Sequence, residues 1–101
     1  MNTNPTIDLD TIITQGVGLV SSQIDGEIVM MSVDNEQYYG LDAVGSRIWE
    51  LIAQPRSVSS VCETLLSEFQ VDRDTCQRDV LNFVERLYAE KIIRLVTPAP
   101  A

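Results

Sequence analysis

The chain has 101 residues and an apolar fraction of 45%, so it can form one domain with a modest hydrophobic core. No apolar run approaches the roughly 20 residues that cross a membrane. The N-terminus lacks the positive charge and apolar run of a secretory signal, so we expect a cytoplasmic protein. Histidine is absent, which removes the commonest general base and the commonest metal ligand.

The net charge of −8 is unevenly distributed along the chain. Residues 1–71 hold ten acidic side chains and two arginines, whereas residues 72–101 hold five acidic and five basic side chains. The chain as a whole would therefore repel a polyanion such as nucleic acid. The C-terminal third is the less repulsive part for an acidic partner.

Residues 1–15 lack a clear hydrophobic period and are predicted to form a loose N-terminal segment. The folded domain is expected to span residues 16–96, followed by a disordered tail at residues 97–101. Four apolar side chains indicate that part of the N-terminal segment lies against the body of the protein: Ile7, Leu9, Ile12 and Ile13.

Three strands are predicted at residues 17–24, 27–33 and 37–41, each rich in apolar or β-branched side chains. Asp25-Gly26 is a strong hairpin signal between the first two strands, and polar turn residues separate the second from the third. The three strands are expected to form a small antiparallel sheet, and the third is a candidate for its free edge.

The third strand has two faces that differ in character. Because side chains alternate along a strand, Tyr39 and Leu41 share one face, while Tyr38 and Gly40 share the other. We expect the face of Tyr39 and Leu41 to be the core side, since Leu41 leads directly into the first helix.

Three helices are predicted after the sheet, at residues 43–53, 58–69 and 75–91, from apolar side chains at helical spacing. Asp42 is well placed to cap the first of them. Gly45 weakens that helix by about 1 kcal/mol relative to alanine, so we expect it to allow close approach of a neighbouring backbone.

Residues 92–96 are strongly apolar and predict either a helical extension or a terminal strand. Strands followed by helices, without alternation, indicate an α+β protein rather than a wound α/β sheet. The predicted architecture is therefore a three-stranded antiparallel sheet followed by three helices, similar to a winged helix-turn-helix.

The sequence lacks the motifs of common enzyme sites. It has no phosphate-binding loop, no dinucleotide-binding glycine pattern and no nucleophile elbow. Its acidic side chains occur at predicted turns and helix starts, where turn and capping roles account for them. We therefore expect a protein that is not an enzyme.

Cys62 and Cys76 are the only thiols. Without histidine they cannot complete a conventional zinc site, so we expect neither a metal nor a cofactor. The favoured interpretation is two small buried side chains on neighbouring helices. A disulfide in an oxidising compartment is the alternative, and redox catalysis is disfavoured because no C-x-x-C motif is present.

A winged-helix DNA-binding regulator is one hypothesis, because such proteins place a basic recognition helix in the major groove. Solvated ion pairs along the third helix are the simpler interpretation of its charges. Three basic side chains there are offset by four acidic ones: Arg73, Arg78 and Arg86 against Asp74, Asp79, Glu85 and Glu90.

Peptide capture fits the pattern better. The predicted edge strand at residues 37–41 offers unpaired backbone groups to which an extended guest can add a further strand. Tyr38, Leu81, Val84 and Tyr88 are candidates for lining a groove beside it. The alternative is that these side chains are ordinary partly buried residues and that the N-terminal segment covers the edge.

Residues 39–51 carry the pattern Tyr-x-Leu-Asp-x-x-Gly-x-x-Ile-Trp. With two more helices after it, this pattern resembles the PqqD-like proteins, the recognition elements for precursors of ribosomally made, modified peptides. The resemblance covers residues 16–96. The tyrosine-rich third strand and Ile48-Trp49 make the chain most similar to the small stand-alone proteins of lasso-peptide gene clusters.

The resemblance implies a non-catalytic protein to which the leader segment of a precursor peptide docks as an extra strand. It implies a leader-cleaving protease and a cyclase as partners. From the charge and the lack of a long apolar run we expect no nucleic acid and no membrane, and the edge strand permits a monomer or weak dimer. The other branch of the family implies a radical SAM maturase with an iron–sulfur cluster, in pyrroloquinoline quinone biosynthesis. The positions implied to bind the leader are Asn35, Glu36, Gln37, Tyr38, Tyr39, Gly40, Val80, Leu81, Val84 and Tyr88.

Overall fold

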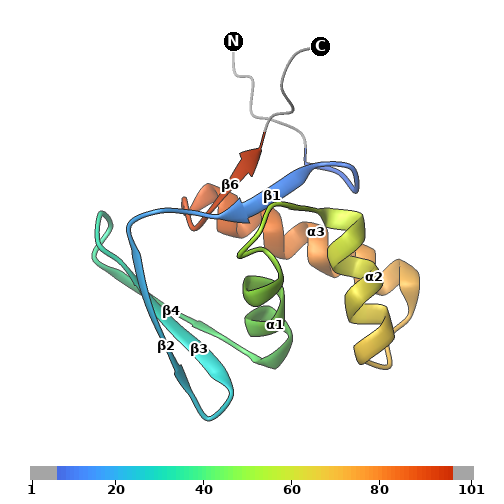
Figure 1. The fold of residues 1–101 in the computed structure, drawn as a ribbon, viewed down its shortest axis with the longest axis horizontal. Helices are drawn as coiled ribbons and strands as arrows, with labels where there is room; N and C mark the ends of the chain where they lie inside the picture. The colour runs from blue at the N-terminus through green and yellow to red at the C-terminus, as the bar shows by residue number, and fades with distance from the viewer. Residues whose placement is uncertain (1–6, 97–101) are drawn as a thin grey trace.

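The computed structural model describes residues 7–96, so the tail expected at residues 97–101 lies outside the described residues (Figure 1). The described part is α+β, with three helices and two three-stranded antiparallel sheets. The predicted class is therefore confirmed, but one of the two sheets was not predicted.

The predicted sheet is formed by β2 (Leu19–Ile24), β3 (Glu27–Ser32) and β4 (Gln37–Leu41), in the order β2-β3-β4. Asp25 and Gly26 form the hairpin turn, and both have a positive φ, of 53° and 82°. That conformation matches the turn that a two-residue hairpin requires. The first strand begins two residues later than predicted, at Leu19 rather than residue 17.

The face assignment for β4 is confirmed. Leu41 is buried and Tyr39 is half-buried, whereas Tyr38 is 74% exposed. The same alternation continues across β3, where Ile28 and Met30 pair with Leu41 and Tyr39 and are buried.

Three helices follow β4: α1 (Ala43–Leu51), α2 (Val58–Glu68) and α3 (Arg73–Ala89). Each begins at a side chain that accepts from a backbone N–H in its first turn, and the predicted Asp42 cap is confirmed at 2.8 Å from Gly45 N. Ser57 caps α2 and Asp72 caps α3. The Asp72 cap explains why α3 begins two residues earlier than predicted.

A serine ties α1 to the sheet. The Ser46 hydroxyl accepts from Ile28 N at 2.9 Å and donates to Leu41 O at 3.1 Å, so it connects β3 and β4 to the helix. Ser46 is buried, and both of its hydrogen bonds are satisfied within the chain. This contact fixes the angle at which the chain turns from β4 into α1.

The second sheet has the order β5-β1-β6, with β1 (Ile12–Gln15) in the centre, β5 (Arg56–Ser57) and β6 (Ile93–Val96). The prediction that residues 12–15 belong to a loose segment is therefore wrong for this part of the chain. The expectation that the segment packs against the body is confirmed, because Ile7 and Ile13 are buried. Of the two alternatives for residues 92–96, the terminal strand is the one observed.

Gly16 is required where β1 meets the loop after α3. Its N–H donates to Ile92 O at 2.7 Å, and a Cβ added at Gly16 would lie 2.6 Å from that same oxygen. The Gly16 N–H and the Ile92 oxygen are both backbone groups, which cannot move aside as easily as a flexible side chain. The absence of a side chain is what allows β1 to approach this loop.

We expect Gly16→Ala to lower the free energy of unfolding by about 1–3 kcal/mol, as overpacking does in other proteins. Urea denaturation of the two proteins measures the difference. Gly40→Ala is the matched control, because a Cβ there meets nothing within 4 Å. An unchanged stability in Gly16→Ala would show that the loop at Ile92 relaxes freely.

Candidate functional site

The edge of β4 is open. Within residues 7–96, β4 pairs only with β3, so the predicted edge position is confirmed. Residues 12–15 do not cover this edge, because β1 pairs instead with β5 and β6 in the other sheet. Backbone groups on the outer side of β4 are therefore available to an additional strand.

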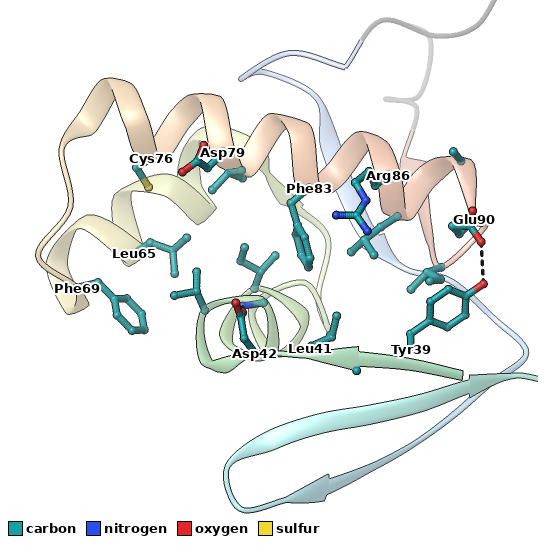
Figure 2. Close-up of a pocket in the computed structure, with 18 of the residues that line it drawn as sticks. Tyr39, Leu41, Asp42, Leu65, Phe69, Cys76, Asp79, Phe83, Arg86 and Glu90 are labelled. Atoms are coloured by element: carbon teal, nitrogen blue, oxygen red, sulfur yellow. Dashed lines mark hydrogen bonds between the residues drawn. The ribbon is translucent and has the colours of Figure 1, made fainter. Parts of the chain in front are cut away.

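A cleft of about 830 Å³ lies beside this edge. β4 and the start of α1 form one wall, α3 forms the opposite wall, and the end of α2 closes one end (Figure 2). The cleft therefore runs along the open edge, in the position where side chains of an added strand would lie.

One end of the cleft is mainly apolar, although Asp42 and Asp79 also lie there. It is lined by Val44 and Ile48 from α1, Leu65 from α2, Phe69 at its end, and Phe83 from α3. Val44 is 38% exposed, so part of this surface is accessible to a guest. Burial of an aliphatic or aromatic side chain here would contribute about 1.5–3 kcal/mol.

Gly45 shapes the apolar end. A Cβ at this position would lie 3.1 Å from Phe83 Cζ and 3.2 Å from Asp42 Oδ1. A close approach was predicted at Gly45, but the group that approaches is an aromatic side chain of α3 rather than a neighbouring backbone. The glycine thus lets the Phe83 ring lie against α1 at the base of the cleft.

The other end of the cleft is polar. The Tyr39 hydroxyl donates to Glu90 Oε1 at 2.9 Å, which connects β4 to the end of α3 (Figure 2). Asn35 Nδ2 donates to the backbone oxygen of Glu90 at 3.4 Å. Partial burial and the hydrogen bond to Glu90 raise the pKa of the Tyr39 hydroxyl above its ordinary value of 10.0.

The predicted leader-binding positions divide into three groups. Tyr38, Tyr39, Gly40 and Val80 line the cleft. The turn and strand residues Asn35, Glu36 and Gln37 are exposed just before this stretch of β4 and do not line the cleft. Leader binding by these positions stays a prediction.

The remaining three predicted positions lie on other faces of α3. Val84 is fully buried, so a charge there would disrupt the core rather than probe the cleft. Tyr88 lines a separate cavity of about 510 Å³, and Leu81 is half-buried away from the cleft lining. The side of α3 that faces β4 is therefore rotated from the predicted one.

Several cleft-lining side chains of α3 and its C-cap were not predicted to line the groove, among them Phe83, Arg86, Leu87 and Glu90. With Val80 they follow helical spacing along one side of the helix. The apolar stripe that contains Val80, Phe83 and Leu87 is visible in the sequence. On one side of this stripe lies Val84, which is fully buried and does not line the cleft. The other side, with Phe83, faces β4 and borders the cleft.

Cys62 and Cys76 are buried on α2 and α3, and both are free, as predicted. Burial raises the pKa of the Cys62 thiol to about 11, and burial also raises that of Cys76. A higher pKa leaves less thiolate at neutral pH, which makes these thiols poor nucleophiles.

We expect iodoacetamide at pH 8 to alkylate Cys62 in the folded protein at least about 100-fold more slowly than an unstructured cysteine peptide. The factor follows from a pKa of about 11, which leaves about 100-fold less thiolate than the ordinary value of 9.0. Mass spectrometry of timed samples measures the rate. Both thiols should react readily in guanidinium. Rapid labelling of Cys62 without denaturant would contradict its burial and its raised pKa.

Residues 7–96 contain no group of three or more histidine, cysteine, aspartate or glutamate side chains placed to hold a metal ion. Within the same residues, no helix has both the length and the apolar character to cross a membrane. The cleft offers an open strand edge, an apolar end and hydrogen-bonding groups, which together suit the binding of an extended peptide.

The chain belongs to the PqqD family. The family model described as coenzyme PQQ synthesis protein D matches residues 27–93, which is more than half of the chain. The match spans β3, β4, all three helices and the start of β6, so it includes both walls of the cleft. Among curated proteins, none matches the chain.

Two solved structures are similar to the whole domain. TbiB1, in complex with the TbiA(beta) leader peptide, has a TM-score of 0.74 and 33% identity, covering 86% of this chain and 99% of its own. A lasso peptide synthetase B1, complexed with its leader peptide, has a TM-score of 0.72, covering 81% of this chain and 96% of its own. At 21% identity the second shows likeness of fold alone.

Proposed function

We propose that this chain is a non-catalytic binding protein that recognises the leader segment of a ribosomally synthesised precursor peptide. The leader adds to the edge of β4 as a further strand, and its side chains occupy the cleft between β4 and α3. The observation that carries the proposal is the open β4 edge beside this cleft. Its occurrence in a chain 33% identical to TbiB1, itself solved with a leader peptide, supports it.

Both the backbone and the side chains of the leader are expected to contribute to the free energy of binding. Each backbone hydrogen bond to the edge contributes only about 0.5–1.5 kcal/mol net, and it carries little sequence information. Apolar anchors at the end lined by Val44, Phe69 and Phe83 supply the remainder of the affinity and the specificity. Neither contribution requires catalytic groups.

The proposed role includes presentation of the bound precursor to a leader-cleaving protease and a cyclase, as in lasso-peptide biosynthesis. The likeness to TbiB1 and to a lasso peptide synthetase B1 supports this branch of the family. We propose a cytoplasmic monomer or weak dimer that acts without a cofactor, a metal, a membrane or a nucleic acid.

A second candidate shares the same binding step. The family description, coenzyme PQQ synthesis protein D, favours a peptide chaperone for a radical SAM maturase in pyrroloquinoline quinone biosynthesis. The two candidates differ in the enzyme that receives the peptide. Identifying which enzyme binds the protein–leader complex distinguishes them.

A winged helix-turn-helix-like regulator is less well supported. Of the α3 arginines, Arg73 pairs with Glu63, and Arg78 lies 3.7 Å from Asp79. These pairs reduce the basic character that a recognition helix needs. We therefore propose a winged-helix likeness for the fold alone and no DNA-binding role.

The test is a titration of the protein with the leader segment of the precursor peptide encoded beside its gene. Saturable binding, with NMR shifts centred on the amides of β4 and on α3, is the expected result. A scrambled leader of the same composition is the control. Equal binding of both peptides, or shifts remote from β4 and α3, would overturn the proposal.

A further inference from the structure

The charged side chains that line the cleft differ in whether they have partners. Asp42 accepts from Gly45 N at 2.8 Å, and Glu90 accepts from the Tyr39 hydroxyl. Asp79 lies 3.7 Å from Arg78. The fourth, Arg86, has no ion pair and no side-chain hydrogen bond within residues 7–96.

Arg86 occupies a particular place in the cleft. Its side chain extends from α3 toward β4, between Phe83 and Glu90 (Figure 2). Glu90 is four residues further along, a spacing at which an acid and an arginine can pair. Its carboxylate accepts from Tyr39 and forms no ion pair with Arg86, whose guanidinium faces the cleft.

A strand added at β4 would remove water from this guanidinium. A buried cation without a partner is costly, whereas a carboxylate can accept two parallel hydrogen bonds from it. Resting on the proposed function, we infer that the leader segment bound in the cleft carries an aspartate or glutamate that pairs with Arg86. Arg86 is then a specificity-determining residue for the leader.

The other charges in the cleft restrict where that acid can lie. Asp42 and Asp79 line the cleft beyond Phe83, and Glu90 lies at the opposite end (Figure 2). An acidic side chain placed near any of them is repelled, and only the position facing Arg86 is attractive. The acid thus fixes the register of the guest as well as its identity.

Helix and strand geometry gives the sequence pattern around the acid. Side chains on one face of a strand recur at about 6.6–6.8 Å, and one helical turn of α3 advances about 5.4 Å. Two residues from the acid, on the side toward Phe83, the guest therefore carries an apolar side chain. Two residues away in the other direction, toward Tyr39 and Glu90, it carries a polar one.

A double-mutant cycle tests the pairing. The binding constant of the leader is measured for the wild type and for Arg86→Gln, with each acidic residue of the leader replaced in turn by its amide. Arg86→Gln is expected to weaken binding about 10-fold to 100-fold, the range for a hydrogen bond to a charged group. One amide replacement should weaken binding to the wild type by a similar factor and have almost no effect on Arg86→Gln.

Arg78→Gln is the matched control, because it removes the same charge from the same helix at a side chain that does not line the cleft. It should change affinity less than about twofold, as expected for a screened charge. Circular dichroism checks that the variants are folded, and salt titration separates pairing from general attraction.

The outcomes separate the pairing from the binding role. If the leader binds but every amide replacement affects the wild type and Arg86→Gln equally, the pairing is overturned and the proposed function stands. Equal losses in Arg86→Gln and Arg78→Gln would also overturn it, since net charge alone would explain them. If no leader segment binds the wild type, the proposed function and this inference both fail.

Discussion

Replacement of Val44 by glutamate is expected to abolish most leader binding while leaving the protein folded. Val44 is 38% exposed and lines the apolar end of the cleft, so the new carboxylate would lie where a guest side chain is to be buried. Loss of an apolar contact of about 1.5–3 kcal/mol alone weakens binding about 10-fold to 150-fold. Desolvation of the charge weakens it further.

The stability of Val44→Glu should stay within about 0.5 kcal/mol of the wild type, as for most surface substitutions. The substitution lies in the first turn of α1, which contains no acidic residue and whose helix dipole favours one. Calorimetric titration with the leader gives the affinity, and urea denaturation gives the stability.

Ala43→Glu is the matched control for Val44→Glu. It adds the same charge in the same helical turn, but Ala43 is exposed and does not line the cleft. Its affinity should fall less than about twofold. If Ala43→Glu and Val44→Glu lose affinity equally, repulsion by the acidic protein would explain the result, and the cleft would not be the binding surface.

The part of the fold with local sequence signals could be predicted. β2, β3 and β4 follow one another, separated by short turns, so alternation and the Asp25-Gly26 turn are sufficient to place them. The open edge of β4 follows from their order. Helix starts are similarly local, because a capping side chain such as Asp42 lies next to the turn that it caps.

The second sheet could not be predicted because its pairings are distant in the sequence. Ile12 pairs with Ser57 and with Val96, and β5 has only two residues. Such short strands carry no measurable period. The buried side chain of Ile13 indicates contact with the core. The strands that pair with β1 follow α1 and α3 in the sequence, so the pairing depends on how these two helices pack.

The cleft was partly predictable. Its strand wall follows from the alternation along β4, but its helix wall depends on the rotation of α3 against α2 and β6. Val84 faces the interior and is fully buried, whereas Phe83, its neighbour, turns toward Gly45. Successive residues of a helix are rotated by about 100° from one another. An error of one residue in the predicted face of α3 therefore assigns a core residue to the cleft.

The glycine in α1 connects these observations. Gly45 reduces helix propensity, and the sequence therefore indicates a packing role for it. The Phe83 ring fills the space left by the missing side chain, at 3.1 Å from where a Cβ would lie. The glycine of the family pattern is thus the residue that allows the contact between α1 and α3, and this contact shapes the cleft.

Trp49→Ala is expected to lower the free energy of unfolding by about 3–5 kcal/mol, the usual cost of removing a buried aromatic side chain. Trp49 is 6% exposed, is one of the buried residues of α1 and belongs to the hydrophobic core. For a domain with a typical stability of about 5–15 kcal/mol, this is a large fraction of the total. Guanidinium denaturation followed by circular dichroism measures it.

Val20→Ala is the control for Trp49→Ala, because Val20 is 60% exposed and its truncation should cost less than about 0.5 kcal/mol. Trp49 does not line the cleft, so the folded fraction of Trp49→Ala should bind the leader with unchanged affinity at low temperature. Val44→Glu has the opposite pattern, with stability kept and affinity lost. A stable Trp49→Ala protein that no longer binds the leader would place the tryptophan in the binding surface instead of the core.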